Sequence, residues 1–132
     1  MPIHFELCEN DRIMVIRISD PWEAGNMTAL YPTQKEYLDK TTQKLHTLLD
    51  MTGAQQMPKN VLRARYNAPS VNHPNSGELA LVSNNMLIRS LADIGFRIIQ
   101  IQKVRFFTQV DEAWNHLRSL IAEERDQVSQ SK

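Results

Sequence analysis

The residues of this chain that could carry chemistry stand directly after two of its apolar runs. Asp50 and Thr52 follow the run Leu45–Leu49, and Asn84 follows the run Leu79–Val82. Short apolar runs bounded by turn residues are typical of strands buried on both faces of a parallel sheet. In open α/β sheets, ligands bind beyond the carboxyl ends of such strands. We therefore predict a ligand or partner site that includes Asp50, Thr52 and Asn84.

A second polar group lies in the loop His-Pro-Asn-Ser-Gly-Glu at residues 73–78. We expect His73, Asn75 and Ser76 to belong to the rim of the same site. A histidine and a serine are also residue types of a hydrolase or transferase, so an enzyme that uses the His73–Glu78 loop is the alternative function. Ser76 lacks the Gly-x-Ser-x-Gly frame of a nucleophile elbow. We therefore predict a protein without catalytic residues.

The four histidines do not predict a metal site. His4, His46, His73 and His116 lie on different predicted elements, and no two of them have the spacing His-x-x-x-His. A zinc site normally needs three or four convergent ligands. His46, inside an apolar run, is interpreted as a hydrogen-bonded core or edge residue. No Gly-x-Gly-x-x-Gly or Walker sequence follows a strand, so no cofactor is predicted.

Composition and charge argue against several classes of protein. A chain of 132 residues is one domain by length, and its 15 basic and 15 acidic residues give zero formal charge, unlike a cationic nucleic-acid binder. A single cysteine, Cys8, cannot form an internal disulfide. No signal-peptide pattern opens the chain, and no apolar run approaches the roughly 20 residues that span a bilayer. We expect a cytoplasmic protein.

Hydrophobic patterns predict the strands that position these residues. Two β-type runs near residues 3–8 and 12–19 flank the polar turn Glu9–Asp11 and predict an antiparallel hairpin. Further strands are predicted near residues 45–50, 79–83 and 103–107. This order predicts an α/β fold with a mixed, mostly parallel five-stranded sheet that begins with the hairpin and is covered by helices.

Helical patterns fill the intervals between the strands. The pattern over residues 27–45 is interrupted at Pro32, and Pro58 is suited to the first turn of a short helix. Ser83 and Asn84 are candidate N-caps for a helix that continues to about residue 100. A last helix carries apolar residues up to Ile121. We predict a single domain over residues 1–122 and a polar tail, residues 123–132, that frays.

The helix predicted over residues 87–100 has more large apolar side chains than one covered face can bury. At about 100° per residue, one face holds Leu87, Leu91, Ile94 and Ile98, and Ile88 and Ile99 widen it. The surplus predicts either an apolar pocket or a contact between two copies of the chain. We assign Leu91, Ile94, Ile98 and Ile99 to that pocket or homodimer surface.

Four segments together follow the pattern of a known family. They are the two-strand start, the central strand ending Leu-Leu-Asp-Met-Thr-Gly, the strand Ala-Leu-Val-Ser before a helix, and the tail Val-Arg-Phe-Phe-Thr-Gln-Val-Asp-Glu-Ala-Trp-Asn-His-Leu. With these features the chain resembles the SpoIIAA-like family of the STAS superfamily, whose fold is related to CRAL-TRIO lipid carriers. The resemblance covers roughly residues 3–121.

The resemblance implies a non-enzymatic binding or regulatory module that engages a protein partner or an apolar, lipid-like ligand. Anti-sigma-factor antagonists of the superfamily are phosphorylated on a hydroxyl that opens the helix after the central strand. The matching segment here, Gln55–Lys59, contains no hydroxyl, so that phospho-switch is not expected. Asp50 and Thr52 resemble the Asp-x-Ser/Thr that ends the central strand in that family. We interpret this pair as one that ties down its own turn.

Overall fold

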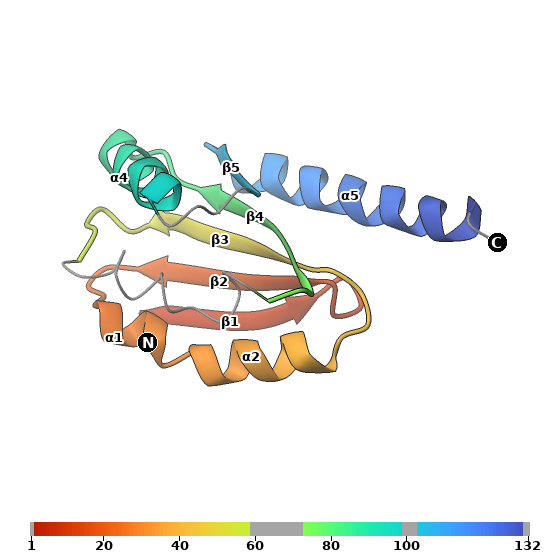
Figure 1. The fold of residues 1–132 in the computed structure, drawn as a ribbon. Coiled ribbons are helices and arrows are strands. Elements are labelled where there is room, and N and C mark those ends of the chain that lie inside the picture. Colours follow the sequence, from red (N-terminus) through yellow and green to blue (C-terminus); the bar gives the residue numbers. More distant parts are fainter. Residues whose placement is uncertain (1, 59–72, 99–102, 131–132) are drawn as a thin grey trace.

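A five-stranded sheet organises the part of the chain that the computed structural model describes. That part comprises residues 2–58, 73–98 and 103–130, with residues 95–98 and 127–130 described by their backbone alone. The strands lie across the sheet in chain order: β1 (Ile3–Cys8), β2 (Ile13–Ser19), β3 (Leu45–Gly53), β4 (Ser76–Val82) and β5 (Val104–Phe107). β1 and β2 are antiparallel, and every other neighbouring pair is parallel (Figure 1). The predicted fold class is confirmed.

Helices cover both faces of this sheet. Three of them, α1 (Ala24–Thr28), α2 (Tyr31–Lys40) and α4 (Met86–Ile98), pack against one face. α5 (Val110–Gln130) packs against the other face (Figure 1). Pro32 lies in the first turn of α2, where a missing backbone N–H costs no hydrogen bond, so the chain divides into α1 and α2 there.

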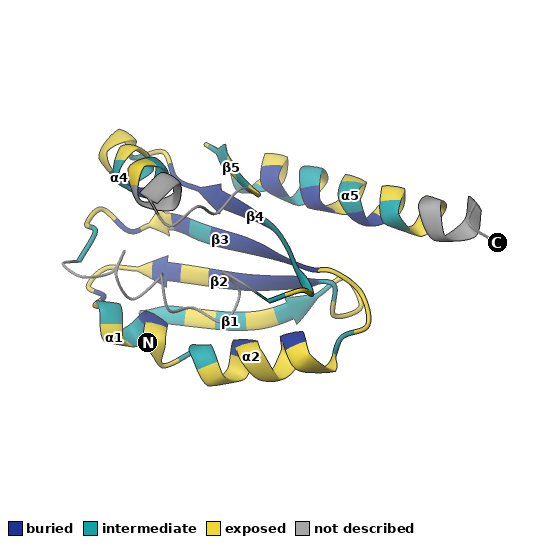
Figure 2. Cartoon of the chain, in the orientation of Figure 1, coloured by how far each residue is buried: buried dark blue, intermediate teal, exposed yellow. Residues whose placement is uncertain are grey.

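The core is built on both sides of β3. All residues from Leu45 to Leu49 are buried, which Figure 2 shows as the dark centre of the sheet. Leu49 belongs to the cluster that includes Ile88 of α4, whereas Leu48 belongs to the cluster that includes Leu117 of α5. Alternate side chains of a strand point to opposite faces, so one strand supplies both halves of the core.

Several boundaries differ from the sequence prediction, and β3 continues to Gly53 where its end was expected near residue 50. β4 begins at Ser76, within a stretch expected to be loop, because Ser76 already pairs with Leu45 of β3. α5 continues to Gln130, where a fraying tail was expected from residue 123. Glu124 forms an ion pair with Arg12 that helps to hold this part of the helix. The helix predicted from Pro58 lies almost entirely outside the described residues.

The central position of β3 predicts an asymmetry between two leucine truncations. Leu49→Ala removes a buried side chain and should lower the free energy of unfolding by about 2–5 kcal/mol. Leu87→Ala is the matched control, because the side chain of Leu87 is 64% exposed; a change within about 0.5 kcal/mol is expected there. Denaturant titration at low protein concentration, where association contributes little, measures both. Equal losses in the two variants would contradict the central position of β3.

Candidate functional site

The residues predicted to form one site lie at opposite ends of the sheet. Asp50, Thr52 and Asn84 stand where β3 and β4 end. Ser76 pairs with Leu45 where the same two strands begin, and His73 and Asn75 directly precede Ser76. Because β3 and β4 are parallel, the two groups are separated by the length of the strands. The structure therefore contains two polar groups in place of one.

At the carboxyl end of β3, Asp50 and Thr52 bind each other. The Oδ1 atom of Asp50 accepts hydrogen bonds from the Thr52 backbone N–H at 2.9 Å and from the Thr52 hydroxyl at 2.7 Å. Both bonds lie within one turn, in the pattern by which aspartate stabilises tight turns. The pair thus has the turn-stabilising arrangement that the sequence predicts.

The N-cap of α4 is Asn85, one residue later than predicted. Its Oδ1 atom accepts hydrogen bonds from the backbone N–H groups of Leu87 at 2.9 Å and Ile88 at 3.2 Å. Such bonds satisfy amides that have no partner inside the helix. Ser83 supports the cap, because its hydroxyl oxygen accepts from the Asn85 N–H. Asn84 is exposed.

At the other end of the sheet, His73 is held by hydrogen bonds at both ring nitrogens. Its Nε2 atom lies 2.8 Å from Oδ1 of Asp39, and its Nδ1 accepts a hydrogen bond of 3.0 Å from the Asn75 N–H. The Nε2 atom therefore carries the proton. The hydrogen bond from Lys35, followed by that from His73, lowers the pKa of the Asp39 carboxyl. No ring nitrogen of His73 is left to act as a base.

The loop around His73 also fastens α2. The side-chain amide of Asn75 donates to the carbonyl oxygens of Leu38 and Thr41, each at 3.0 Å, and so satisfies carbonyls at the end of α2. Within residues 2–58, 73–98 and 103–130, His73 has no hydrogen bond to a serine or threonine hydroxyl. A nucleophile needs an adjacent base to be activated, so this geometry favours a structural role for the loop.

A third polar group, which the sequence did not predict, surrounds His46 beneath α5. The His46 side chain is 4% exposed, and its Nε2 atom lies 2.6 Å from Oε1 of Glu124. Its Nδ1 atom accepts a 2.9 Å hydrogen bond from the Glu78 N–H. A Cβ at Gly77 would lie 2.3 Å from Nδ1, so only glycine fits beside the ring. His46 is the hydrogen-bonded core residue that the sequence predicts.

Further charged residues complete this polar group. The Glu78 carboxylate lies 2.5 Å from Nε2 of His116 and 3.1 Å from Nε of Arg105. Arg12 pairs with Glu124 and donates from Nε to the Lys44 carbonyl at 3.0 Å. The described part of the chain contains no group of three side chains able to hold a metal ion. These hydrogen bonds and the ion pair between Arg12 and Glu124 tie α5 to the sheet.

Most of the exposed large apolar side chains in the described part of the chain lie on α4. Met86 is 80% exposed, Leu87 64% and Ile94 54%, while Leu91 is half-buried. We refer to these four residues as the α4 surface. The side of α4 that packs on the sheet carries Ile88 and Ala92 instead. The surplus apolar stripe predicted from the sequence therefore points away from the core at Leu87 and Ile94.

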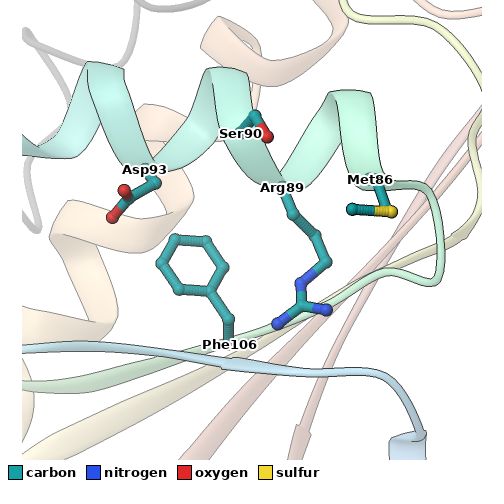
Figure 3. A pocket seen from close by; sticks show the side chains of 5 residues that line it. All are labelled: Met86, Arg89, Ser90, Asp93 and Phe106. Carbon is teal, nitrogen blue, oxygen red and sulfur yellow. The ribbon is translucent and has the colours of Figure 1, made fainter.

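A shallow hollow of about 360 Å³ borders the α4 surface on its β5 side. Figure 3 shows Arg89 and Asp93 on the side of α4 that faces Phe106 of β5; Met86 and Ser90 also line the hollow. The backbone of α4 continues past Gly95 to Ile98. The predicted contribution of the Ile98 side chain and of Ile99 lies outside the described residues.

The comparisons with known proteins give no family. No family model matches the chain, and no curated protein matches it significantly. Among the helices described, none has the length and apolar character needed to cross a membrane. Function must therefore be inferred from the chain's own geometry.

The burial of His46 predicts a pH dependence of stability. Desolvation lowers the pKa of His46 from its ordinary value of 6.5, despite the nearby Glu124 carboxylate that raises it. The unfolded chain therefore binds a proton first as the pH falls below about 6.5, and stability decreases there. Urea titrations between about pH 5 and 7.5 should show a shallower dependence for His46→Gln. His4→Gln, on an exposed histidine of β1, is the control. An unchanged dependence in His46→Gln would contradict this assignment.

The hydrogen bonds of Thr52 predict that this residue is not a phosphorylation switch. Thr52→Glu removes the hydroxyl bond to Asp50 and places a second carboxylate beside it, so stability should fall by about 1 kcal/mol. Thr52→Val, which loses the bond without adding charge, separates the two effects. Partner binding and sedimentation should stay as in the unsubstituted chain. Stoichiometric phosphothreonine at position 52 in protein from native cells would contradict the prediction.

Proposed function

We propose that this chain is a non-enzymatic, STAS-like interaction module that binds a protein partner through the α4 surface. The supporting observation is the clustering of exposed apolar side chains. Within the described residues, four large apolar residues are exposed, and three of them (Met86, Leu87 and Ile94) lie on α4. Tyr37 of α2 is the fourth, at 36% exposure. Contiguous apolar patches of this kind mark interaction sites.

The free energy available from covering this surface supports a binding role. Full burial of a Leu, Ile or Met side chain stabilises by roughly 1.5–3 kcal/mol. More than half of Met86, Leu87 and Ile94 is still open to solvent in the isolated chain. A partner that covers these side chains therefore gains several kcal/mol, which offsets the loss of translational and rotational freedom on association.

A protein fits this surface better than an apolar small molecule does. Small-molecule sites usually enclose most of their ligand, whereas the α4 surface is the outer side of a helix. The hollow beside it is bordered by the charged residues Arg89 and Asp93. An apolar centre with a polar rim is the usual anatomy of a protein–protein interface. The lipid-like ligand that the resemblance also implies therefore receives less support.

The enzyme alternative receives little support from the His73–Glu78 loop. Both ring nitrogens of His73 are engaged, one by Asp39 and the other by the Asn75 N–H. A general base must reach the proton that it abstracts. The loop instead holds the end of α2 beside the start of β4 through the hydrogen bonds of His73 and Asn75.

A photo-crosslinking residue at position 87 tests the proposal in living cells. Replacing Leu87 should give a discrete protein adduct, because a partner covers this side chain when bound. The same crosslinker at Tyr37, a residue of α2 that is 36% exposed and stacks on Phe5 of β1, is the control and should give no such adduct. Adding Ile94→Asp should abolish the adduct at position 87 by placing a charge in the contact. Adducts of lipid mass, or equal adducts at positions 37 and 87, would contradict a protein-binding role for α4.

A further inference from the structure

We propose that the hollow between α4 and β5 binds a small organic acid, with the carboxylate of the ligand on the Arg89 guanidinium and its apolar body against Phe106. The hollow has a volume of about 360 Å³. This site goes beyond the proposed function, because Arg89 lies about 160° around the helix from Leu87 and faces β5 (Figure 3). A small acid can therefore bind whether or not a protein covers the outer side of α4.

The observation that carries this inference is a half-buried arginine without an acceptor. Among the arginines whose side chains the structure describes, Arg12 and Arg89 are half-buried and the others are exposed. Arg12 pairs with Glu124 and donates to the Lys44 carbonyl. The Arg89 side chain, by contrast, forms no hydrogen bond or ion pair with another described residue. Donors that are partly removed from water without an acceptor cost free energy, and an anion in the hollow offsets that cost.

The nearest carboxylate on α4 does not neutralise Arg89. Asp93 follows four residues later, at a spacing that often gives ion pairs on a helix, yet no ion pair joins these two described residues. Figure 3 shows the Phe106 ring between their side chains, and Asp93 has an interaction of its own within the chain. The guanidinium donors of Arg89 therefore remain available to a ligand.

A carboxylate suits this site better than a phosphate does. The planar guanidinium can donate two parallel hydrogen bonds to either anion. A phosphate monoester, however, carries a charge of about −1.5 to −2 at pH 7, and the Asp93 carboxylate also lines the hollow. The repulsion from Asp93 is smaller for a ligand with a single negative charge.

Two of the lining side chains provide apolar contacts for the rest of the ligand. The ring of Phe106 stands beside the Arg89 side chain (Figure 3), and Met86, which is 80% exposed, lies at the rim. An aromatic ring and a thioether both pack well against an aromatic ligand. The volume of the hollow is at the lower end of the roughly 300–1,000 Å³ of small-molecule sites. The site therefore fits a small acid with an aromatic body.

The position of the hollow in the sheet agrees with a ligand site. Leu81 of β4 pairs with Phe106 of β5, close to the carboxyl ends of both strands. Ligands of open α/β sheets bind outside these ends. Arg89 lies in the first half of α4, the helix that follows β4. The arginine and the ring thus meet at the end of the sheet where ligands are usually found.

An NMR titration of the full chain with sodium benzoate, at constant pH and ionic strength, tests the inference. Benzoate joins a carboxylate to an aromatic ring, and benzamide has a similar shape without the charge. Benzoate should shift the backbone amide signals of residues 86–93 and 104–107 and saturate with a dissociation constant on the order of millimolar, because the hollow is shallow. Benzamide should bind about tenfold more weakly or worse. Inorganic phosphate, which has no apolar body, should also bind more weakly than benzoate.

Substitutions of Arg89 separate its charge from its shape. Arg89→Met keeps an unbranched side chain and removes the charge, so the affinity for benzoate should fall about tenfold or more. Arg89→Lys keeps the charge and loses the planar fork, so a smaller loss is expected. Arg105→Met is the matched control and should leave the affinity unchanged. Arg105 directly precedes Phe106 in β5 and points to the other face of the sheet, where it pairs with Glu78.

Several outcomes would overturn the inference. They are equal affinities for benzoate and benzamide, an unchanged affinity in Arg89→Met, and no saturable shift of residues 86–93 and 104–107 at tens of millimolar benzoate. Phosphate that binds as tightly as benzoate would indicate a general anion site and overturn the assignment to a carboxylic acid. Leu87→Ala, which removes part of the α4 surface, should leave the affinity for benzoate unchanged. The acid site and the protein-binding role of α4 can therefore fail separately.

Discussion

The burial of β3 on both faces is the constraint on which the rest of this structure depends. Residues 45–49 are all buried, so neither face of the strand can be left to solvent. A parallel strand in this position must be covered by helices on both sides. α5 supplies one cover through Leu117, and α1, α2 and α4 supply the other. One side of each helix therefore packs on the sheet, and only the side chains on the opposite side are available for contacts with other molecules.

The fold was predictable from the sequence because its signals are local. The apolar run that begins at Leu45 can be recognised from a few consecutive residues. The same holds for the hairpin around the Glu9–Asp11 turn. The candidate site was not predictable as one place, because the strand register decides it: Ser76 pairs with Leu45, which puts Ser76 and Asp50 at opposite ends. The sequence also does not distinguish Asn84 from Asn85 as the N-cap, because asparagine is a good N-cap at either position. In the structure the cap is Asn85.

Long-range ion pairs account for the remaining differences. The segment after residue 122 has the polar composition of a fraying tail, yet Glu124 pairs with Arg12, 112 positions earlier. The same carboxylate binds His46, whose burial is tolerated because both ring nitrogens have partners. Clusters of buried titratable groups often mark functional sites. Here the groups of the cluster have partners inside the chain, and these contacts explain how α5 is held against the sheet.

α2 and α4 differ in the side chains on their outer sides, and this difference supports the proposed binding role of α4. Both helices cover the same face of the sheet. The outer side of α2 carries Lys35, Glu36, Asp39 and Lys40 in exposed ion pairs at a spacing of four residues, as expected for a helix that faces only water. The outer side of α4 carries Leu87 and Ile94, which add no burial to the isolated fold. Its inner side is served by Ile88 and the small Ala92, so the outer leucine and isoleucine are not needed to fill the core. Large apolar side chains at these two positions stabilise the protein only when something covers them, and a helix selected for covering the sheet alone would resemble α2.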